Sequence, residues 1–146
     1  MIDDVYNARI LELAGAVPSP STLDAPDGSA TKHSKLCGST VRIDVNVDGD
    51  VVTDLAMQVK ACALGQAAAS VVAANGVGAT RAEVVEARDK LRAMLRGEDE
   101  RPQGRFADLA FLEPVKDYRA RHASTLLANE ALAEAMGAAL DRAAAA

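Results

Sequence analysis

The clearest pattern along the chain is a period-two alternation of apolar and polar residues in two runs between positions 41 and 59. Valine and isoleucine alternate with Arg, Asp and Asn over residues 41–47, and the same period of two continues over residues 51–59. The two runs are separated by Asp48-Gly49-Asp50, and an Asp-Gly pair is typical of a tight hairpin turn. The pattern therefore predicts a β-hairpin with one buried face. We expect a third strand over residues 30–36, because three strands make a more stable sheet than two.

Outside this region the apolar residues follow helical spacing. Residues 2–14 are compatible with a short amphipathic helix, and residues 17–29 are rich in Pro, Ser, Asp and Gly, which predicts a loop. From residue 65 onward, the small-residue run GQAAASVVAA predicts a helix that stops at Asn75-Gly76.

The remaining helices are indicated by their boundaries. Thr80 and Glu83 form a capping box that opens a helix, and Gly97 ends it. A last helix is expected to start near Tyr118 and run into the Ala-rich tail. The order predicts one α+β domain over residues 1–146, a small three-stranded antiparallel sheet with helices packed on one face.

Composition narrows the classes of function. Of the 146 residues, 49% are hydrophobic and 25% are charged, which allows a sizeable core and argues against wholesale disorder. The net charge of −5 argues against a nucleic-acid binder. No apolar run reaches the length of a membrane span, and the acidic N-terminus lacks the plan of a secretory signal. We therefore expect a cytoplasmic protein whose two cysteines are thiols in a reducing compartment.

The two cysteines are the candidates for chemistry. Cys37 lies just after the first expected strand and Cys62 just after the third. In an antiparallel meander the ends of strands one and three lie at the same edge, so the two thiols are expected to meet. The helix after Cys62 favours a thiolate there, and thiolates are nucleophiles and soft metal ligands. On residue type alone, each cysteine could equally be an inert core residue.

Three motifs occur in order: Cys37-Gly38-Ser39, Cys62 before GQAAASVVAA, and ARHASTLLANEAL with Ser124. In this order and spacing the chain resembles the U-type iron–sulfur cluster assembly scaffolds, IscU, SufU and the N-terminal part of NifU, from about residue 4 to 137. Those proteins show Cys-Gly-Asp first, a second cysteine before a small-residue helix, and a third cysteine near the last long helix.

The chain departs from that family pattern at several positions. Ser39 replaces the Asp of Cys-Gly-Asp, and Ser124 stands at the third cysteine. IscU has a histidine just before its third cysteine, whereas here that position is Ala123 and His122 precedes it. LEPVK at residues 112–116 is similar to the LPPVK chaperone-binding motif, but Glu113 replaces a proline, so chaperone binding is not carried over.

The resemblance implies a metal or cluster site. A [2Fe–2S] cluster takes four ligands, usually Cys and sometimes His. Cys37 and Cys62 are the expected metal ligands, with His33 and His122 as candidate nitrogen donors. On a regular first strand, His33, Lys35 and Cys37 share one face. Ser39 and Ser124 are weaker members, and their alternative roles are turn and helix-start residues; the two histidines could equally be solvated. The site would hold iron, an iron–sulfur cluster or zinc, within one chain or shared in a homodimer.

Three outcomes stay open for this chemistry. The chain could bind metal or cluster weakly, relay persulfide sulfur from a cysteine desulfurase through Cys37 or Cys62, or retain only partner binding. We expect an assembly scaffold or sulfur-relay accessory protein without turnover of its own, with a cysteine desulfurase and acceptor apoproteins as partners. The alternative is a degenerate non-metal adaptor that binds and modulates the desulfurase. A thiol redox protein is a third interpretation.

Overall fold

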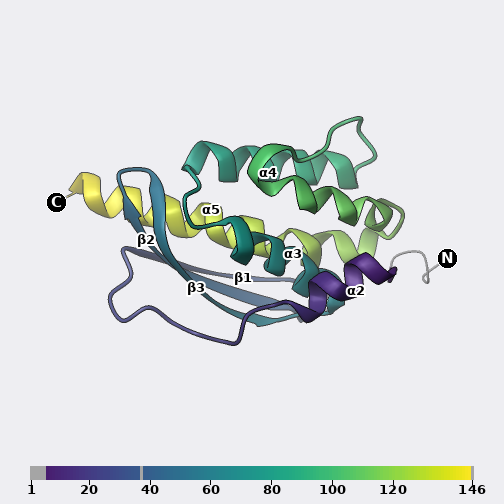
Figure 1. The fold of residues 1–146 in the computed structure, drawn as a ribbon, viewed down its shortest axis with the longest axis horizontal. Coiled ribbons are helices and arrows are strands. Elements are labelled where there is room, and N and C mark those ends of the chain that lie inside the picture. Colours follow the sequence, from purple (N-terminus) through teal and green to yellow (C-terminus); the bar gives the residue numbers. More distant parts are fainter. Residues whose placement is uncertain (1–5, 37, 146) are drawn as a thin grey trace.

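A three-stranded antiparallel sheet in the order β1-β2-β3 forms one side of the molecule, and helices cover one of its faces (Figure 1). The computed structural model describes residues 6–36 and 38–145. Its elements are α2 (Ala8–Gly15), β1 (Gly28–His33), β2 (Thr40–Asp48), β3 (Val51–Lys60), α3 (Ala63–Asn75), α4 (Arg81–Leu95), the 3₁₀ segments η1 (Gly104–Asp117) and η2 (Arg119–Arg121), and α5 (His122–Ala145). The predicted α+β architecture is confirmed.

The predicted hairpin forms, and β2 follows the predicted alternation, but a register shift at Asn46/Val47 buries Val52 of β3 and leaves Thr53 exposed. Val41, Ile43 and Val45 of β2 are fully buried against the helices, and Gly49 in the turn has a φ of 63°, a conformation that suits glycine. At one end of the sheet, His33 pairs with Thr40, and Thr40 pairs with Lys60. The ends of β1 and β3 therefore lie at the same edge, as a meander predicts.

The first strand is shorter than predicted, because it ends at His33 and does not reach residue 36. The backbone turns there: the Ser34 N–H donates to the Ser39 carbonyl at 2.8 Å, and the Gly38 N–H donates to the Ser34 carbonyl at 2.9 Å. Gly38 has a φ of 68°, which suits this tight turn. The expectation that His33 and Lys35 share one face of a regular strand is therefore wrong. Cys37, the third residue of that expectation, lies outside the described residues.

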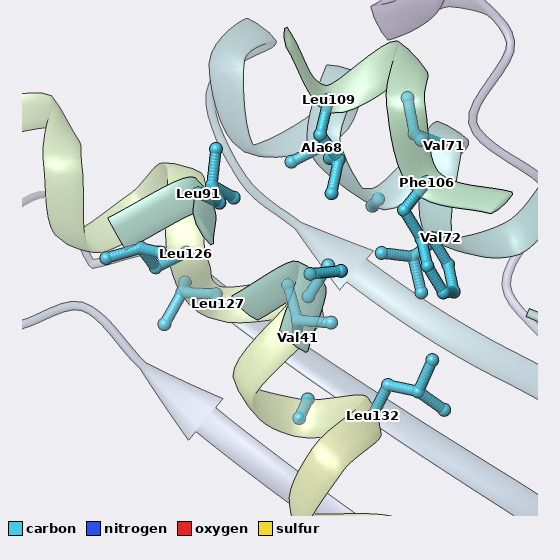
Figure 2. Close-up of a cluster of buried hydrophobic side chains, with 14 of the residues drawn as sticks. Val41, Ala68, Val71, Val72, Leu91, Phe106, Leu109, Leu126, Leu127 and Leu132 are labelled. Carbon is cyan, nitrogen blue, oxygen red and sulfur yellow. The ribbon is translucent and has the colours of Figure 1, made fainter. Parts of the chain in front are cut away.

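The core joins the sheet to the helices above it. Figure 2 shows that its side chains come from β2, α3, α4, η1 and α5; those labelled are Val41, Ala68, Val71, Val72, Leu91, Phe106, Leu109, Leu126, Leu127 and Leu132. At Gly28 the backbone of β1 comes so close to α5 that an added Cβ would lie 2.1 Å from the Ala135 carbonyl oxygen. This glycine lets the long helix lie directly on the sheet.

The helix boundaries follow local capping chemistry. The capping box of Thr80 and Glu83 opens α4, as predicted. The helix α2 begins at Ala8, because the Asn7 side chain accepts a hydrogen bond from the Ile10 N–H and caps it; residues 2–5 of the predicted helix lie outside the described residues. Among the described residues, none of the helices combines the length and apolar character that crossing a membrane requires.

Two features between α4 and α5 differ from the prediction. The segment Gly104–Asp117 forms 3₁₀ turns, which the sequence pattern did not indicate. The last helix begins at His122 and not near Tyr118, because Arg119–Arg121 forms a separate 3₁₀ turn. His122 therefore lies at the very start of α5, two residues before Ser124.

Candidate functional site

Three segments that are distant in sequence meet at one end of the sheet. They are the turn after β1, the junction between β3 and α3, and the start of α5. The first two are joined through the paired row of His33, Thr40 and Lys60. The third is joined to the second by a contact between Cys62 and Ser124. Of the predicted site residues that the structure describes, Cys62 and Ser124 are the pair in contact at this end.

Cys62 occupies the N-cap position of α3, with extended backbone (φ −67°, ψ 171°). Its carbonyl accepts the Gln66 N–H at 2.9 Å, while its side chain makes no capping hydrogen bond. The thiol is half-buried and free of any disulfide. The unpaired N–H groups at the start of a 13-residue helix favour a negative charge close by.

The Cys62 Sγ lies 3.6 Å from the Ser124 Oγ, within the range of a hydrogen bond to sulfur. Ser124 is fully buried, and its hydroxyl donates to the Arg121 carbonyl at 3.1 Å. Because that proton is directed at Arg121, the oxygen is left to accept from the thiol. Ser124 thus does two things at once: it fixes the start of α5 and contacts the cysteine.

A glycine brings the two helices together at this point. A Cβ added to Gly65 would lie 2.8 Å from the Ala61 Cβ and 3.2 Å from the Ser124 carbonyl oxygen. The absence of a side chain lets the first turn of α3 approach the first turn of α5, which places Cys62 beside Ser124. The small-residue run predicted this helix, but the sequence pattern did not single out Gly65. Its place three residues after the cysteine is the signal that could have found it.

His33 lies on the sheet face that points away from the helices. Its neighbour Lys32 reaches Glu134 of α5 at 3.2 Å, so the alternation along the strand directs His33 to the opposite face. There its Nδ1 lies 3.1 Å from the Thr40 Oγ1. That contact leaves Nε2 as the ring atom that could reach a metal. Thr40 was missed as a partner of this histidine, although the strand register predicts the pair.

His122 links the start of α5 to the end of η1. Its Nε2 lies 3.0 Å from the Val115 carbonyl oxygen and 3.1 Å from that of Lys116. Carbonyl oxygens only accept, so Nε2 must carry the proton. In the neutral ring, Nδ1 is then the free acceptor and the only nitrogen that could bind a metal.

Ser39 is buried, and its carbonyl holds the turn that follows β1. Cys37 lies outside the described residues. Within residues 6–36 and 38–145, no three His, Cys, Asp or Glu side chains gather closely enough to hold a metal ion. Cys62 supplies a thiol, and the histidines each supply one free ring nitrogen.

The chain matches a known protein family and a named relative. The family model described as NifU-like N terminal domain matches residues 6–125. The iron-sulfur cluster assembly scaffold protein IscU of Thermotoga maritima is 26% identical over 134 residues, which cover 90% of this chain and 92% of that protein.

Solved structures of two other proteins are similar to this fold. A nitrogen-fixing NifU-like protein (N-terminal) from Brucella abortus is 52% identical, covers 96% of both chains and superposes with a TM-score of 0.91. A putative iron-sulfur cluster assembly scaffold protein for the SUF system from Fervidobacterium islandicum AW-1 has the same fold, with a TM-score of 0.82 at 21% identity over 90% of this chain and 96% of that one. The matched residues include both sides of the Cys62–Ser124 contact, and the chain belongs to the NifU-like N terminal domain family.

Proposed function

We propose that the protein is an iron–sulfur cluster assembly scaffold that receives its cargo at Cys62 and Cys37. The observation that carries the proposal is the half-buried Cys62 thiol at the N-terminus of α3, at the family's site position in a chain that matches the family over residues 6–125. A relative named as an iron-sulfur cluster assembly scaffold matches over 90% of the chain and supports it.

The cargo would be iron or an iron–sulfur cluster, and zinc would also suit these donors. Two thiolates per chain leave a four-ligand set half complete. The free Nδ1 of His122 and the free Nε2 of His33 are the described nitrogen donors that could add to it. The other way to four ligands is a second copy of the chain, whose two thiolates would complete the set. Ser39 and Ser124 would support the site through the turn and the helix start that they hold.

A sulfur-relay step is compatible with the same residues. A Cys62 thiolate would attack the outer sulfur of a persulfide carried by a cysteine desulfurase. The new bond joins that sulfur to Cys62, the donor's sulfur–sulfur bond breaks, and the donor cysteine leaves as a thiolate. Acceptor apoproteins would then take the assembled cargo. The protein has no turnover of its own in this scheme, and the reducing cytoplasm suits its thiols.

One observation favours a second candidate, a non-metal adaptor that binds and modulates the desulfurase. The Ser124 hydroxyl at the third-ligand position donates to the Arg121 carbonyl, so it acts as a helix-start residue. A neutral hydroxyl is also a poor substitute for a thiolate. If the metal site is lost, binding of the desulfurase should survive in the Cys37→Ser, Cys62→Ser double variant.

The experiment is to purify the protein without oxygen and to measure iron, zinc and acid-labile sulfide together with the visible absorption spectrum. The scaffold predicts iron with matching sulfide, lost in Cys62→Ser at an unchanged midpoint of thermal unfolding. Ser70→Ala is the matched control, because Ser70 is buried in the same helix and donates only to the Gln66 carbonyl. Unchanged metal content in Cys62→Ser would refute the proposal. Zinc without iron would favour the sulfur relay, and protein without metal would favour the adaptor.

A further inference from the structure

The face of the sheet that points away from the helices carries a groove beside the Cys62 end. Its volume is about 500 Å³, and its lining includes Pro20, Thr31, Thr40, Arg42, Gln58 and Lys60. In Figure 1 the segment between α2 and β1 runs along this side of the sheet. The groove therefore lies between that segment and the exposed side chains of the strands.

The groove carries positive charge from Arg42 and Lys60. None of the described residues that line it is acidic. Among the residues that the structure describes, none forms an ion pair with Lys60. Arg42 donates from Nε to the Asp44 carboxylate at 3.1 Å, and its two terminal nitrogens make no hydrogen bond with any described residue. Both cations are thus able to receive an anionic group.

Asp44 offsets only part of this charge. Its carboxylate is buried and accepts hydrogen bonds from the Ser29 hydroxyl at 2.7 Å and from the Leu23 N–H at 3.1 Å, besides that of Arg42. Burial alone would raise the pKa of Asp44, but the hydrogen bonds from Ser29, Leu23 and Arg42 together lower it, so the carboxylate is ionised. One negative charge therefore faces two cations, and the terminal nitrogens of Arg42 and the Lys60 ammonium stay open to a ligand.

The strand register orders the donors in two neighbouring rows. Arg42 pairs with Thr31 and Gln58, and Thr40 pairs with His33 and Lys60. Arg42 and Lys60 are thus diagonal neighbours on one face, at a spacing of about 7–8 Å. In an extended peptide, side chains two residues apart point the same way and lie about 7 Å apart. Two carboxylates in such a segment match the two cations.

We propose that this groove binds an extended acidic segment of a partner protein, with carboxylates two residues apart that pair with Arg42 and Lys60. Threonine hydroxyls and the Gln58 amide supply further hydrogen bonds, and Pro20 supplies an apolar contact for the residue between the carboxylates. Lys60 lies two residues before Cys62 in the sequence, so the docked segment would lie beside the thiol site. The inference needs no metal or cluster at Cys62, so its failure and the failure of the proposed function are separate results.

The test is a titration of ¹⁵N-labelled protein, followed by NMR, with a blocked hexapeptide of alternating Glu and Val. The proposal predicts saturable shifts of the amides of Thr31, Thr40, Arg42, Gln58 and Lys60, which weaken as salt is added. The counterpart peptide with Gln in place of Glu should cause no such shifts. Shifts confined to other surfaces would overturn the proposal. Inorganic phosphate that shifts the same amides with equal affinity would also overturn it, because the groove would then be a site for free anions.

Charge variants decide whether the two cations are responsible. Arg42→Gln with Lys60→Gln should weaken peptide binding by about tenfold, from the loss of two exposed ion pairs. Arg88→Gln with Arg96→Gln removes the same charge from the half-buried Arg88 of α4 and from its exposed C-cap Arg96, and should leave binding unchanged. Because Arg42 also contacts the buried Asp44, Lys60→Glu alone serves as the second variant and should abolish binding. Equal weakening by the α4 pair, or full binding by Lys60→Glu, would refute the assignment.

Discussion

Replacing Ser124 by cysteine should create a chelating pair with Cys62. The Sγ of Cys62 and the Oγ of Ser124 lie 3.6 Å apart. Around a tetrahedral zinc ion with zinc–sulfur bonds of about 2.3 Å, two ligand sulfurs lie about 3.8 Å apart. The two positions are therefore already at ligand separation, and little movement of α3 or α5 is needed.

The gain can be estimated from the ligand count and the packing. A four-ligand structural zinc site is worth about 10–16 kcal/mol, or about 3–4 kcal/mol for each ligand. Ser124 is fully buried, so the larger sulfur costs about 1 kcal/mol of repacking. The net gain of about 2–3 kcal/mol corresponds to zinc binding about 30- to 150-fold tighter than in the natural chain.

The assay is zinc competition with a chromogenic chelator, under reducing and oxygen-free conditions that keep both thiols free. Ser70→Cys is the matched control: it adds a thiol at a buried serine in α3, about 12 Å along the helix from Cys62. The reasoning is refuted if Ser124→Cys binds zinc no more tightly than Ser70→Cys while its unfolding midpoint is retained. In that case Cys62 would not be a metal ligand in the folded chain.

Three further predictions concern the stability of the fold that carries the site, and each is tested by measuring the free energy of unfolding with a chemical denaturant. Gly28→Ala should cost about 3 kcal/mol, because its Cβ would lie 2.1 Å from one α5 backbone atom and 2.7 Å from another, whereas Gly15→Ala meets nothing within 4 Å and should not destabilise. Thr80→Ala should cost about 1 kcal/mol by removing the α4 cap, and Thr80→Ser should recover most of it. The folded pKa of Asp44 lies below its unfolded value, so its stabilising contribution is present above about pH 4 and is lost as pH falls through the folded value. Asp44→Asn should remove that part of the pH dependence, and an unchanged acid profile would contradict the assignment.

The sequence predicted the elements whose signals are local. The hairpin follows from an alternation that only a half-buried strand pair satisfies, together with the Asp-Gly turn. The start of α4 follows from the reciprocal capping of Thr80 and Glu83, which involves only residues three apart. In both cases the chemistry that fixes the element is contained in a few neighbouring residues.

The element boundaries that the sequence did not predict depend on contacts between residues farther apart or on backbone hydrogen bonds. The end of β1 at His33 is set by backbone hydrogen bonds between Ser34, Gly38 and Ser39, which no side-chain pattern reveals. The late start of α5 depends on His122, whose ring bonds to carbonyls at the end of η1. Before the fold is known, nothing in the sequence tells that Val115 and Lys116 will lie beside that ring.

For the candidate site, the resemblance assigned Cys62 and Ser124 to one place, and the structure shows them in contact. The residue that permits the contact, Gly65, is visible only when the approach of α3 to α5 is known. The histidines illustrate the limit of spacing arguments. Their positions follow from the sequence, but the nitrogen that remains free on each ring follows from hydrogen-bond partners that only the fold supplies.

At this end of the molecule, the start of α5 is held by hydrogen bonds, whereas the groove on the sheet is open. Ser124 and His122 both make hydrogen bonds to backbone carbonyls, so the start of α5 is held in place, and Gly65 holds α3 against it. The position of the Cys62 thiol is therefore set by the fold before any partner binds. The groove, by contrast, presents two cations on the open face of the sheet: Lys60, which forms no ion pair with a described residue, and Arg42, which pairs with Asp44 through Nε alone. A thiol held in place beside these exposed cations is the arrangement expected if chemistry occurs at Cys62 and recognition occurs on the open face of the sheet.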